Sequence, residues 1–367
     1  MKDILIVDFN ATAPVYTAYF CDALVKAGLR VDILSPQNKE ALSVLDFLDL
    51  NFLSKIESTR SSSLKASMYI YYWSRVLKIA KNYKAIHFQW FPLLSKSPFD
   101  YFMLQRLERQ NSNLFYTVHN CLPHEDRSQK TFSRYKKIYE MIPNLVVHTS
   151  ATKEELISKF GIQSERITKI NHGPFYKELA FKPDHLPDPK KITLGMIGHI
   201  RPYKGYEDAF TLVKQAKGTD NEFNLSISGG GKKEYIDKLK SCIKKLDLTE
   251  HVTINHGYIK TKALIKLHHE VDAILAPYKR IDQSGAVITA LSLGIPVLGY
   301  SIGGISQVIS NKYNGYLSKK NEPEGLLNGI KWLQNNSKKD IYENCIKSTD
   351  SFSWGVSAQA LKPKYLS

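Results

Sequence analysis

Short apolar runs alternate with longer amphipathic segments along the chain, and this alternation limits the fold more than any other feature of the sequence. The runs of the first half are DILIVDF (3–9), RVDILSP (30–36), AIHFQW (85–90), NLFYTVHN (113–120) and NLVVHTS (144–150). Those of the second half are KITLGMIGHI (191–200), FNLSISGGG (223–231), HVTINHGYI (251–259), VDAILAPY (271–278), IPVLGY (295–300) and GYLS (315–318). Segments such as YTAYFCDALVKAG (16–28) separate them with helical spacing. Strands that alternate with helices predict parallel sheets covered on both faces, so we expect an α/β protein built from Rossmann-like units.

The chain length and one proline-rich segment indicate two domains. A single core rarely grows beyond about 250 to 300 residues, and this chain has 367. The segment KELAFKPDHLPDPKK (177–191) holds three prolines and little periodicity, which is typical of a linker. We therefore expect an N-terminal domain at 1–175 and a C-terminal domain at 190–345. The remaining segment, 346–367, could pack back on the N-terminal domain.

The charge of the chain favours an acidic partner. Lys and Arg number 51 against 35 Asp and Glu, a formal net charge of +16. Nucleic acid, anionic lipid headgroups and phosphorylated substrates all fit this charge. The lysines are spread along the chain and no nucleic-acid-binding motif occurs, which argues against nucleic acid.

The cysteines and the amino terminus favour a cytoplasmic protein. The four cysteines lie far apart without metal-ligand spacing and are expected to be reduced thiols. MKDILIVDF (1–9) has the pattern of a strand rather than of a signal peptide. No apolar stretch reaches the length of about 18 residues that would span a membrane.

The turn IRPYKG (200–205) holds two cations after an apolar run. Gly198 and Gly205 allow a tight turn and a close approach to a ligand. A helix start favours anions, so Arg201 and Lys204 beside one suggest a phosphate site. A solvated loop in a lysine-rich chain is the alternative.

Two further loops of the second half follow strands. Ser284 and Gly285 begin the expected helix AVITALSL, so their N–H groups could bind a second anion. Plain capping of that helix by Asp282 or Ser284 is the alternative. Gly229 and Gly230 also follow a strand, although they complete neither a dinucleotide fingerprint nor a P-loop.

The first half has two loops of the same kind. In TVHNCLPHED (117–126) the strand ends in His119 and Asn120, and His124 follows; a histidine there could contact a ligand or simply be a satisfied polar side chain. Metal binding is the weaker interpretation, because the ligand spacing is not a recognised one. Asn10 and Thr12 follow the first strand and leave room for a ligand, or they cap the helix that begins near residue 15.

Taken together, GHIRPYKG (198–205), IDQSGAVITALSLGIPV (281–297), TVHNCLPHE (117–125) and SIGGISQVISNKYNGYL (301–317) resemble retaining nucleotide-sugar glycosyltransferases of the GT-B fold, family 4, known from bacterial polysaccharide biosynthesis. VVHTSATKEEL (146–156) and INHGPF (170–175) extend the resemblance. It implies two Rossmann-like domains that face each other across a cleft. It also implies transfer of a sugar from a nucleoside diphosphate to an acceptor hydroxyl with the anomeric configuration kept. No metal or cofactor is implied, since the nucleotide sugar is a substrate.

The resemblance assigns roles to particular residues. Arg201 and Lys204 would hold the donor diphosphate, Asp282 would contact the transferred sugar, and His119 would orient it electrostatically. The implied donor contacts are Gly198, Arg201, Lys204, Gly229, Gly230, Tyr258, Asp282, Ser284, Gly285 and Thr289. The implied acceptor or cleft residues are Asn10, Thr12, His119, Asn120 and His124.

Two loops depart from the family pattern. The family carries two glutamates eight positions apart, where this chain has Ile281 and Thr289, so the ribose contact is weakened. His199 stands where many relatives have Arg, and Arg201 is displaced by two positions.

The resemblance also suggests an acceptor and a place of action. Many relatives glycosylate polyprenol-diphosphate-linked saccharides at the inner face of the membrane. The segment SSLKASMYIYYWSRVLKIAKNYK (62–84) mixes basic and aromatic residues as an interfacial helix does, or forms a core helix with a basic exposed face. The rival classes are a non-catalytic nucleotide-sugar or glycan-binding protein, a GT-B epimerase or phosphorylase, and a nucleic-acid binder.

Overall fold

The computed structural model describes residues 1–59, 61–123, 126–180, 192–281 and 284–367. The chain forms two compact units. Unit 1 contains Met1–Gly173 and Ser353–Ser367, and unit 2 contains Pro174–Phe352. The division at 173/174 falls beside the proline-rich segment, and the last fifteen residues belong with the first half of the chain.

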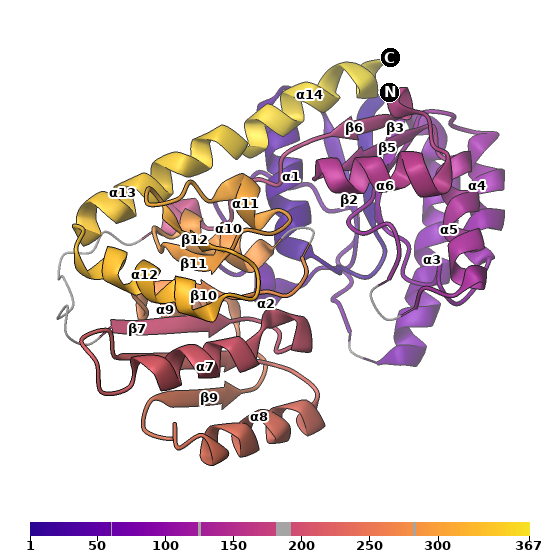
Figure 1. The fold of residues 1–367 in the computed structure, drawn as a ribbon. Coiled ribbons are helices and arrows are strands. Elements are labelled where there is room, and N and C mark those ends of the chain that lie inside the picture. The colour runs from indigo at the N-terminus through magenta and orange to yellow at the C-terminus, as the bar shows by residue number, and fades with distance from the viewer. Residues whose placement is uncertain (60, 124–125, 181–191, 282–283) are drawn as a thin grey trace. The chain divides into compact units, whose positions relative to one another are not determined.

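Unit 1 is built on a six-stranded parallel sheet in the order β2-β1-β3-β4-β5-β6 (Figure 1). Its strands are β1 (Lys2–Asp8), β2 (Val31–Leu34), β3 (Tyr83–Trp90), β4 (Leu114–Thr117), β5 (Asn144–Val147) and β6 (Ile167–Lys169). The strand order reverses between β1 and β3, and ligands of open parallel sheets bind at such a reversal, beyond the carboxyl ends of the strands.

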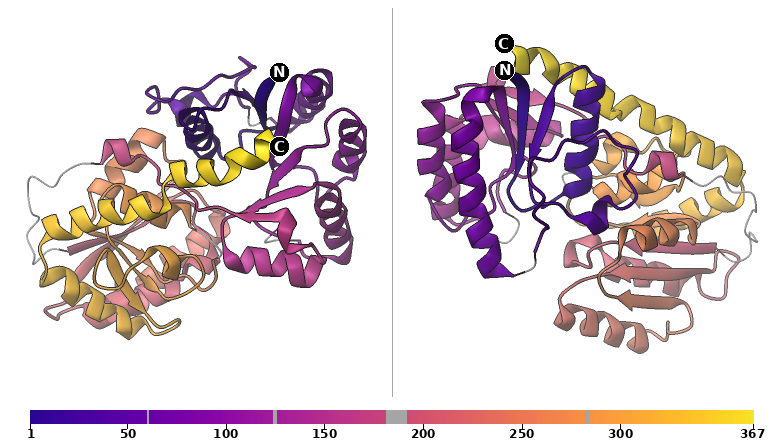
Figure 2. Two further views of the ribbon diagram at one scale, coloured as in Figure 1. Left: turned by 90° about the horizontal axis from the view of Figure 1, so that it is seen from above. Right: turned by 180° about the vertical axis from the view of Figure 1, so that it is seen from behind.

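The helices of unit 1 cover both faces of this sheet. They are α1 (Pro14–Lys26), α2 (Lys39–Leu42), α3 (Ser62–Ile79), α4 (Phe99–Glu108), α5 (Gln129–Met141), α6 (Ser150–Phe160) and α14 (Trp354–Leu366), with 3₁₀ turns η1 (Ala80–Asn82) and η2 (Ser164–Arg166). One face packs an aromatic and aliphatic core under α3 to α6, centred on Trp73 and Phe88. On the other face α1 lies against α14, the last helix of the chain (Figure 2). Trp354 and Phe352, near the end of the chain, are both buried.

Unit 2 repeats the scheme with the strand order β12-β11-β10-β7-β8-β9. Its strands are β7 (Ile192–Ile197), β8 (Phe223–Gly229), β9 (Val252–His256), β10 (Ala273–Ala276), β11 (Val297–Tyr300) and β12 (Gly315–Ser318). Read in chain order this is the dinucleotide-fold arrangement 3-2-1-4-5-6, with the reversal between β7 and β10. The two parallel sheets confirm the predicted α/β class.

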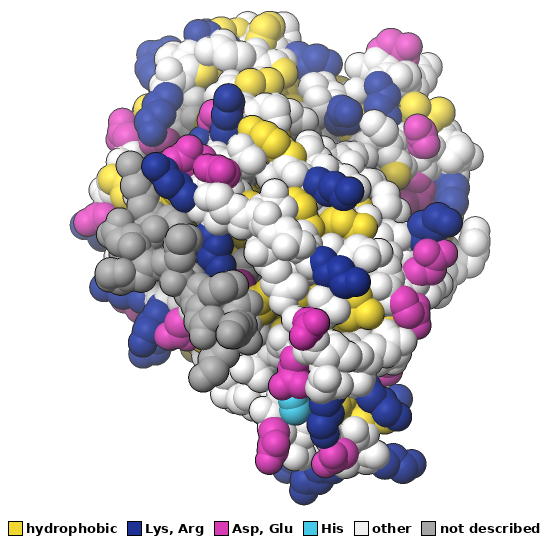
Figure 3. Space-filling view, turned by 60° about the vertical axis from the view of Figure 1, so that its left-hand side comes forward, with side chains coloured by type: hydrophobic (Ala, Val, Ile, Leu, Met, Phe, Trp, Pro, Cys, Tyr) yellow, Lys and Arg dark blue, Asp and Glu magenta, His cyan; other side chains and the backbone are white. Residues whose placement is uncertain are grey.

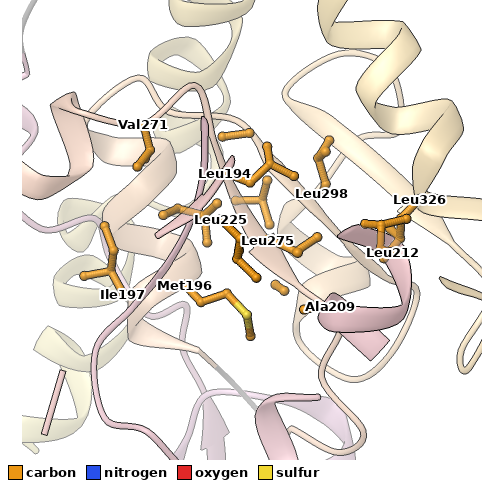
Figure 4. Close-up of a cluster of buried hydrophobic side chains, with 14 of the residues drawn as sticks. Leu194, Met196, Ile197, Ala209, Leu212, Leu225, Val271, Leu275, Leu298 and Leu326 are labelled. Carbon is orange, nitrogen blue, oxygen red and sulfur yellow. The ribbon is translucent and has the colours of Figure 1, made fainter. Parts of the chain in front are cut away.

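Helices pack on both sides of the second sheet. They are α7 (Tyr206–Ala216), α8 (Lys233–Lys245), α9 (Thr261–His269), α10 (Gly285–Ser292), α11 (Ile305–Val308), α12 (Pro323–Gln334) and α13 (Lys338–Ser348), with 3₁₀ turns η3 (Lys177–Leu179), η4 (Pro202–Lys204) and η5 (Thr349–Phe352). Figure 4 shows Leu194, Leu225, Leu275 and Leu298 of four neighbouring strands in one cluster, with Leu212 of α7 close by. This apolar core fixes the strand ends from which the site loops leave.

Candidate functional site

Two loops of unit 2 leave the sheet on either side of the strand reversal, and they are tied together. The loop after β7 contains η4, and the loop after β10 begins at Pro277. Gly205 has a φ of +74°, and a Cβ there would lie 1.9 Å from the carbonyl oxygen of Pro277. The Lys279 amide donates a hydrogen bond to the Tyr203 carbonyl at 2.7 Å. The predicted anion loop therefore lies at the position where Rossmann-like sheets bind nucleotides.

Lys204 is a buried cation without a carboxylate partner in the part of the chain that the structure describes. The residue is only 5% exposed. Its ammonium donates to the Ile197 carbonyl at 3.3 Å and lies 5.8 Å from the centre of the Tyr278 ring. Burial, together with the charge of Arg201, lowers the pKa of Lys204 to about 8. A buried charge is costly unless it is paired, so an anion bound beside Lys204 would be strongly stabilised.

Arg201 and His199 stand on the exposed side of the same loop. Arg201 occupies the cap position of η4 in extended backbone, and its side chain is exposed. His199 is exposed as well, and partial burial with the charges of Arg201 and Lys204 lowers its pKa. The loop thus carries one exposed cation, Arg201, and one buried cation, Lys204. Both of the predicted phosphate-binding side chains lie in one turn.

The predicted glycines of the neighbouring strand pack against this turn. Gly229 ends β8 with a φ of +156°, and a Cβ there would lie 1.9 Å from the Gly198 carbonyl oxygen. The Ile200 amide donates to the Gly230 carbonyl at 2.7 Å. Close backbone packing therefore explains Gly229 without a ligand. Tyr258, which follows β9, is 61% exposed.

Ser284 begins α10 and caps it. Its hydroxyl accepts a hydrogen bond from the Val287 amide at 3.3 Å. The Ser284 side chain is thus a helix cap, as the alternative interpretation expected. The amide of Gly285 lies in the first turn of α10, where backbone N–H groups lack partners within the helix. Thr289 lies buried within α10. Asp282 lies outside the described residues.

In unit 1, His119 lies just beyond the end of β4 and is held between two aromatic rings. It stacks on Trp90 with ring centres 4.0 Å apart and an angle of 6° between the planes. The Tyr16 ring meets it edge-on at 4.9 Å. Burial lowers the pKa of His119 to about 3, with the nearby His172 and His87 adding to the effect. His119 is therefore neutral at physiological pH, and its Nε2 has no hydrogen-bond partner among the described residues.

Two histidines that the sequence analysis did not single out lie beside it. His148 follows β5 and His172 follows β6, and their rings lie 5.3 Å apart. His148 lies 5.5 Å from His119. The sequence signal was present, because VVHTS places a histidine directly after an apolar run, as TVHN does, and INHGPF places one two residues after Ile170.

The remaining predicted residues of unit 1 lie at the sheet edge or outside the described part. The Thr12 amide donates to Asp8 Oδ1 at 3.2 Å. The capping alternative for this loop is wrong: α1 begins at Pro14, and its cap position is Ala13 with no side-chain hydrogen bond. Asn10 and Asn120 are half-buried, and His124 lies outside the described residues. Within the described ranges no group of three or more His, Cys, Asp or Glu side chains could hold a metal ion.

Comparison with known proteins assigns both units to glycosyltransferase families. Residues 178–351 match the family "Glycosyl transferases group 1", and residues 13–173 match "Glycosyltransferase Family 4". A crystal structure of HepE from Anabaena in complex with UDP and glucose has a TM-score of 0.71 at 16% identity and covers 99% of both chains. A glycosyltransferase from Rickettsia africae has a TM-score of 0.70 at 16% identity, covering 99% of this chain and 97% of that one. The chain has the GT-B fold, and each of its two units matches a family of glycosyltransferases.

The curated relatives match over part of their length. An uncharacterized glycosyltransferase of Haemophilus influenzae is 27% identical over 146 residues, which are 39% of this chain and 40% of that protein. The GDP-mannose:glycolipid 4-beta-D-mannosyltransferase of Xanthomonas campestris is 22% identical over 230 residues, which are 60% of this chain and 62% of the relative. The chain therefore spans about half the length of the curated relatives it matches.

Proposed function

We propose that the protein is a retaining glycosyltransferase that moves a sugar from a nucleoside diphosphate to a hydroxyl of a lipid-linked saccharide in surface polysaccharide assembly. One observation carries the proposal. Lys204 is buried without a carboxylate partner in the described part of the chain, in the loop beside the strand reversal of a dinucleotide-type sheet. A bound diphosphate would supply the negative charge that pairs with this cation.

The chemistry follows from the charge that develops on the leaving group. As the glycosidic bond to the diphosphate breaks, negative charge accumulates on the departing oxygen, and fixed cations stabilise it more than they stabilise the ground state. Lys204 and Arg201 take this role, with the amide of Gly285 at the start of α10 as a further donor. His119, which is neutral, orients the sugar by hydrogen bonding rather than by charge.

The relatives support the donor and acceptor classes. Crystal structures of HepE contain UDP and UDP-glucose, and the Xanthomonas relative is named for GDP-mannose and a glycolipid. The two nucleotides carry different bases, so the experiment includes both UDP-sugars and GDP-sugars as donors. A non-catalytic binding protein is not favoured, because the matched relatives are named as transferases.

The proposal is tested by nucleotide release. The protein is incubated with UDP- and GDP-sugars and a lipid-linked acceptor, and the product diphosphate and the anomeric configuration of the product are measured. Lys204→Ala should lower turnover about 100- to 1,000-fold. Lys214→Ala, the same change on the exposed side of α7, is the matched control. Equal turnover in the two variants, or an inverted product, would contradict the proposed mechanism.

We further propose that unit 1 binds the inner face of an anionic membrane through α3 and α4. Figure 1 shows these helices side by side. Large apolar side chains are exposed on both, Ile70 on α3 at 61% and Phe102 on α4 at 57%. Exposed Lys65 and Lys78 flank the apolar positions of α3. Apolar side chains bordered by lysines fit a surface of anionic headgroups.

No helix in the described ranges is long and apolar enough to cross a membrane. On the face shown in Figure 3, Lys and Arg side chains are scattered among acidic ones rather than gathered in a single patch. Vesicle flotation compares phosphatidylglycerol with phosphatidylcholine. Phe102→Ser should reduce flotation with the anionic vesicles, whereas Lys240→Ser on α8 should not; equal flotation of the two variants removes the membrane proposal.

A further inference from the structure

Two groups of buried hydrogen-bonding side chains meet on the α1-facing side of the unit 1 sheet. The Tyr365 hydroxyl of α14 lies 2.6 Å from Nδ1 of His87, and Nε2 of His87 lies 2.7 Å from Oγ1 of Thr117. Thr117 neighbours the Tyr16 hydroxyl, which lies 3.0 Å from Nε2 of His148. All five side chains are more than nine-tenths buried. Together they extend from the last helix of the protein to the carboxyl edge of the sheet.

Both histidine rings of these groups are neutral. Burial lowers the pKa of His87 to about 3 and holds that of His148 well below its usual range, so each ring carries a single proton. A neutral imidazole donates from one nitrogen and accepts at the other, so His87 bridges the hydroxyls of Tyr365 and Thr117. Among the described residues Nδ1 of His148 has no hydrogen-bond partner, so the Tyr16 hydroxyl at Nε2 is the group that holds this ring.

The Tyr16 ring is the contact between this network and His119. Four rings meet it edge-on, with centres 4.9 Å away for His119, 5.4 Å for His148, 5.3 Å for His172 and 5.1 Å for Trp354. A tyrosine bonded at its hydroxyl and packed at its ring cannot turn without breaking both sets of contacts. His119 is consequently held in one orientation against Trp90.

We infer that Tyr16 is a positioning residue for His119, and that its hydrogen bond to His148, the packing of Trp354 of α14 and the neighbouring Tyr365–His87–Thr117 group fix its ring. The inference rests on the proposed function for its effect on turnover, since His119 acts there on the bound sugar. The titratable groups around His119 are Tyr16 of α1, His87 of β3, His148 after β5 and His172 after β6. The C-terminal helix thereby sets the geometry of a residue at the other end of the sheet.

Tyr16→Phe tests the inference, because it removes the hydroxyl and keeps the ring. The freed ring should admit water to His119, whose imidazole should then titrate at a higher pH in a ¹³C-histidine NMR titration without substrate. Turnover should fall about 10- to 100-fold with the donor KM unchanged. Tyr365→Phe changes the hydrogen-bonding side chain that lies farthest from His119. It should move the His119 titration in the same direction by a smaller amount.

Tyr139→Phe is the matched control for lost stability. Tyr139 is buried in the same unit and donates a hydrogen bond to the Cys121 carbonyl at 2.9 Å. It is not one of the hydrogen-bonding side chains around Tyr16. Tyr139→Phe should leave the His119 titration and turnover as in the unchanged protein. If Tyr16→Phe and Tyr139→Phe give the same titration of His119, the inference is overturned. If the unchanged protein transfers no sugar, the proposed function fails while the titration still tests the positioning.

Discussion

At the scale of single residues, the candidate site depends on charge and protonation rather than on shape. Lys204 is protonated and unpaired in the described part of the chain, while His119 is neutral, and burial causes both departures from ordinary behaviour. Burial disfavours the charged form of a base, so it lowers the pKa of each. The difference lies in the size of the shift: Lys204 still carries its charge at neutral pH and His119 does not.

The lowered pKa of Lys204 predicts a pH dependence for nucleotide binding. As the pH rises through about 8, the free protein loses this charge, whereas a bound diphosphate would retain the proton. Linkage then requires weaker binding, about tenfold between pH 7 and 9 for UDP or GDP. Calorimetry measures the dissociation constant, and Lys204→Met should bind weakly at both pH values. An identical pH profile in both proteins would assign the dependence to another group.

At the scale of elements, one buried carboxyl joins α3 to α4. Asp100 of α4 accepts hydrogen bonds from the Tyr69 hydroxyl and, at 3.1 Å, from the Trp73 indole, both on α3. Burial raises the pKa of Asp100 to about 6 despite these bonds. Between about pH 4 and 6, Asp100 is therefore protonated in the folded state but ionised in the unfolded chain.

This linkage predicts how stability changes with pH. Stability from Asp100 is present below about pH 4 and falls as the pH rises toward 6, because the ionised carboxyl is then buried. Asp100→Asn should remove that part of the pH dependence. Urea unfolding across the range measures it, with the exposed Asp237→Asn as the control. A slope unchanged by Asp100→Asn would contradict the prediction.

The turn between β7 and α7 depends on glycine for a steric reason. Gly205 is left-handed and faces the Pro277 carbonyl with no room for a Cβ. Gly205→Ala should therefore lower the melting temperature and nucleotide affinity together, whereas Gly218→Ala, also left-handed but with nothing within 4 Å of a Cβ, should lower stability by only about 1 kcal/mol. Thermal unfolding with and without UDP separates the two effects. Similar losses in both variants would show that backbone strain alone matters.

At the scale of the whole molecule, unit 1 is completed by the end of the chain. Trp354 packs its ring against Gly173, where a Cβ would lie 2.3 Å from the indole, and against Tyr16. Trp354→Ala should destabilise unit 1 by about 3 to 5 kcal/mol. Hydrogen exchange should show faster opening in unit 1 with little change in unit 2; equal opening in both units would contradict the division of the chain.

The sequence by itself determined the two α/β halves, the loops that follow their strands and the paired cations at 201 and 204, because these depend on local periodicity and on residues close together in the chain. It did not reveal that Lys204 is buried or that His148 and His172 join His119, since burial and the meeting of loops depend on which strands pair. Nor could it place Tyr365 beside His87, 278 residues away. Such contacts form only when the last helix packs on the first sheet, and the tertiary structure alone decides them.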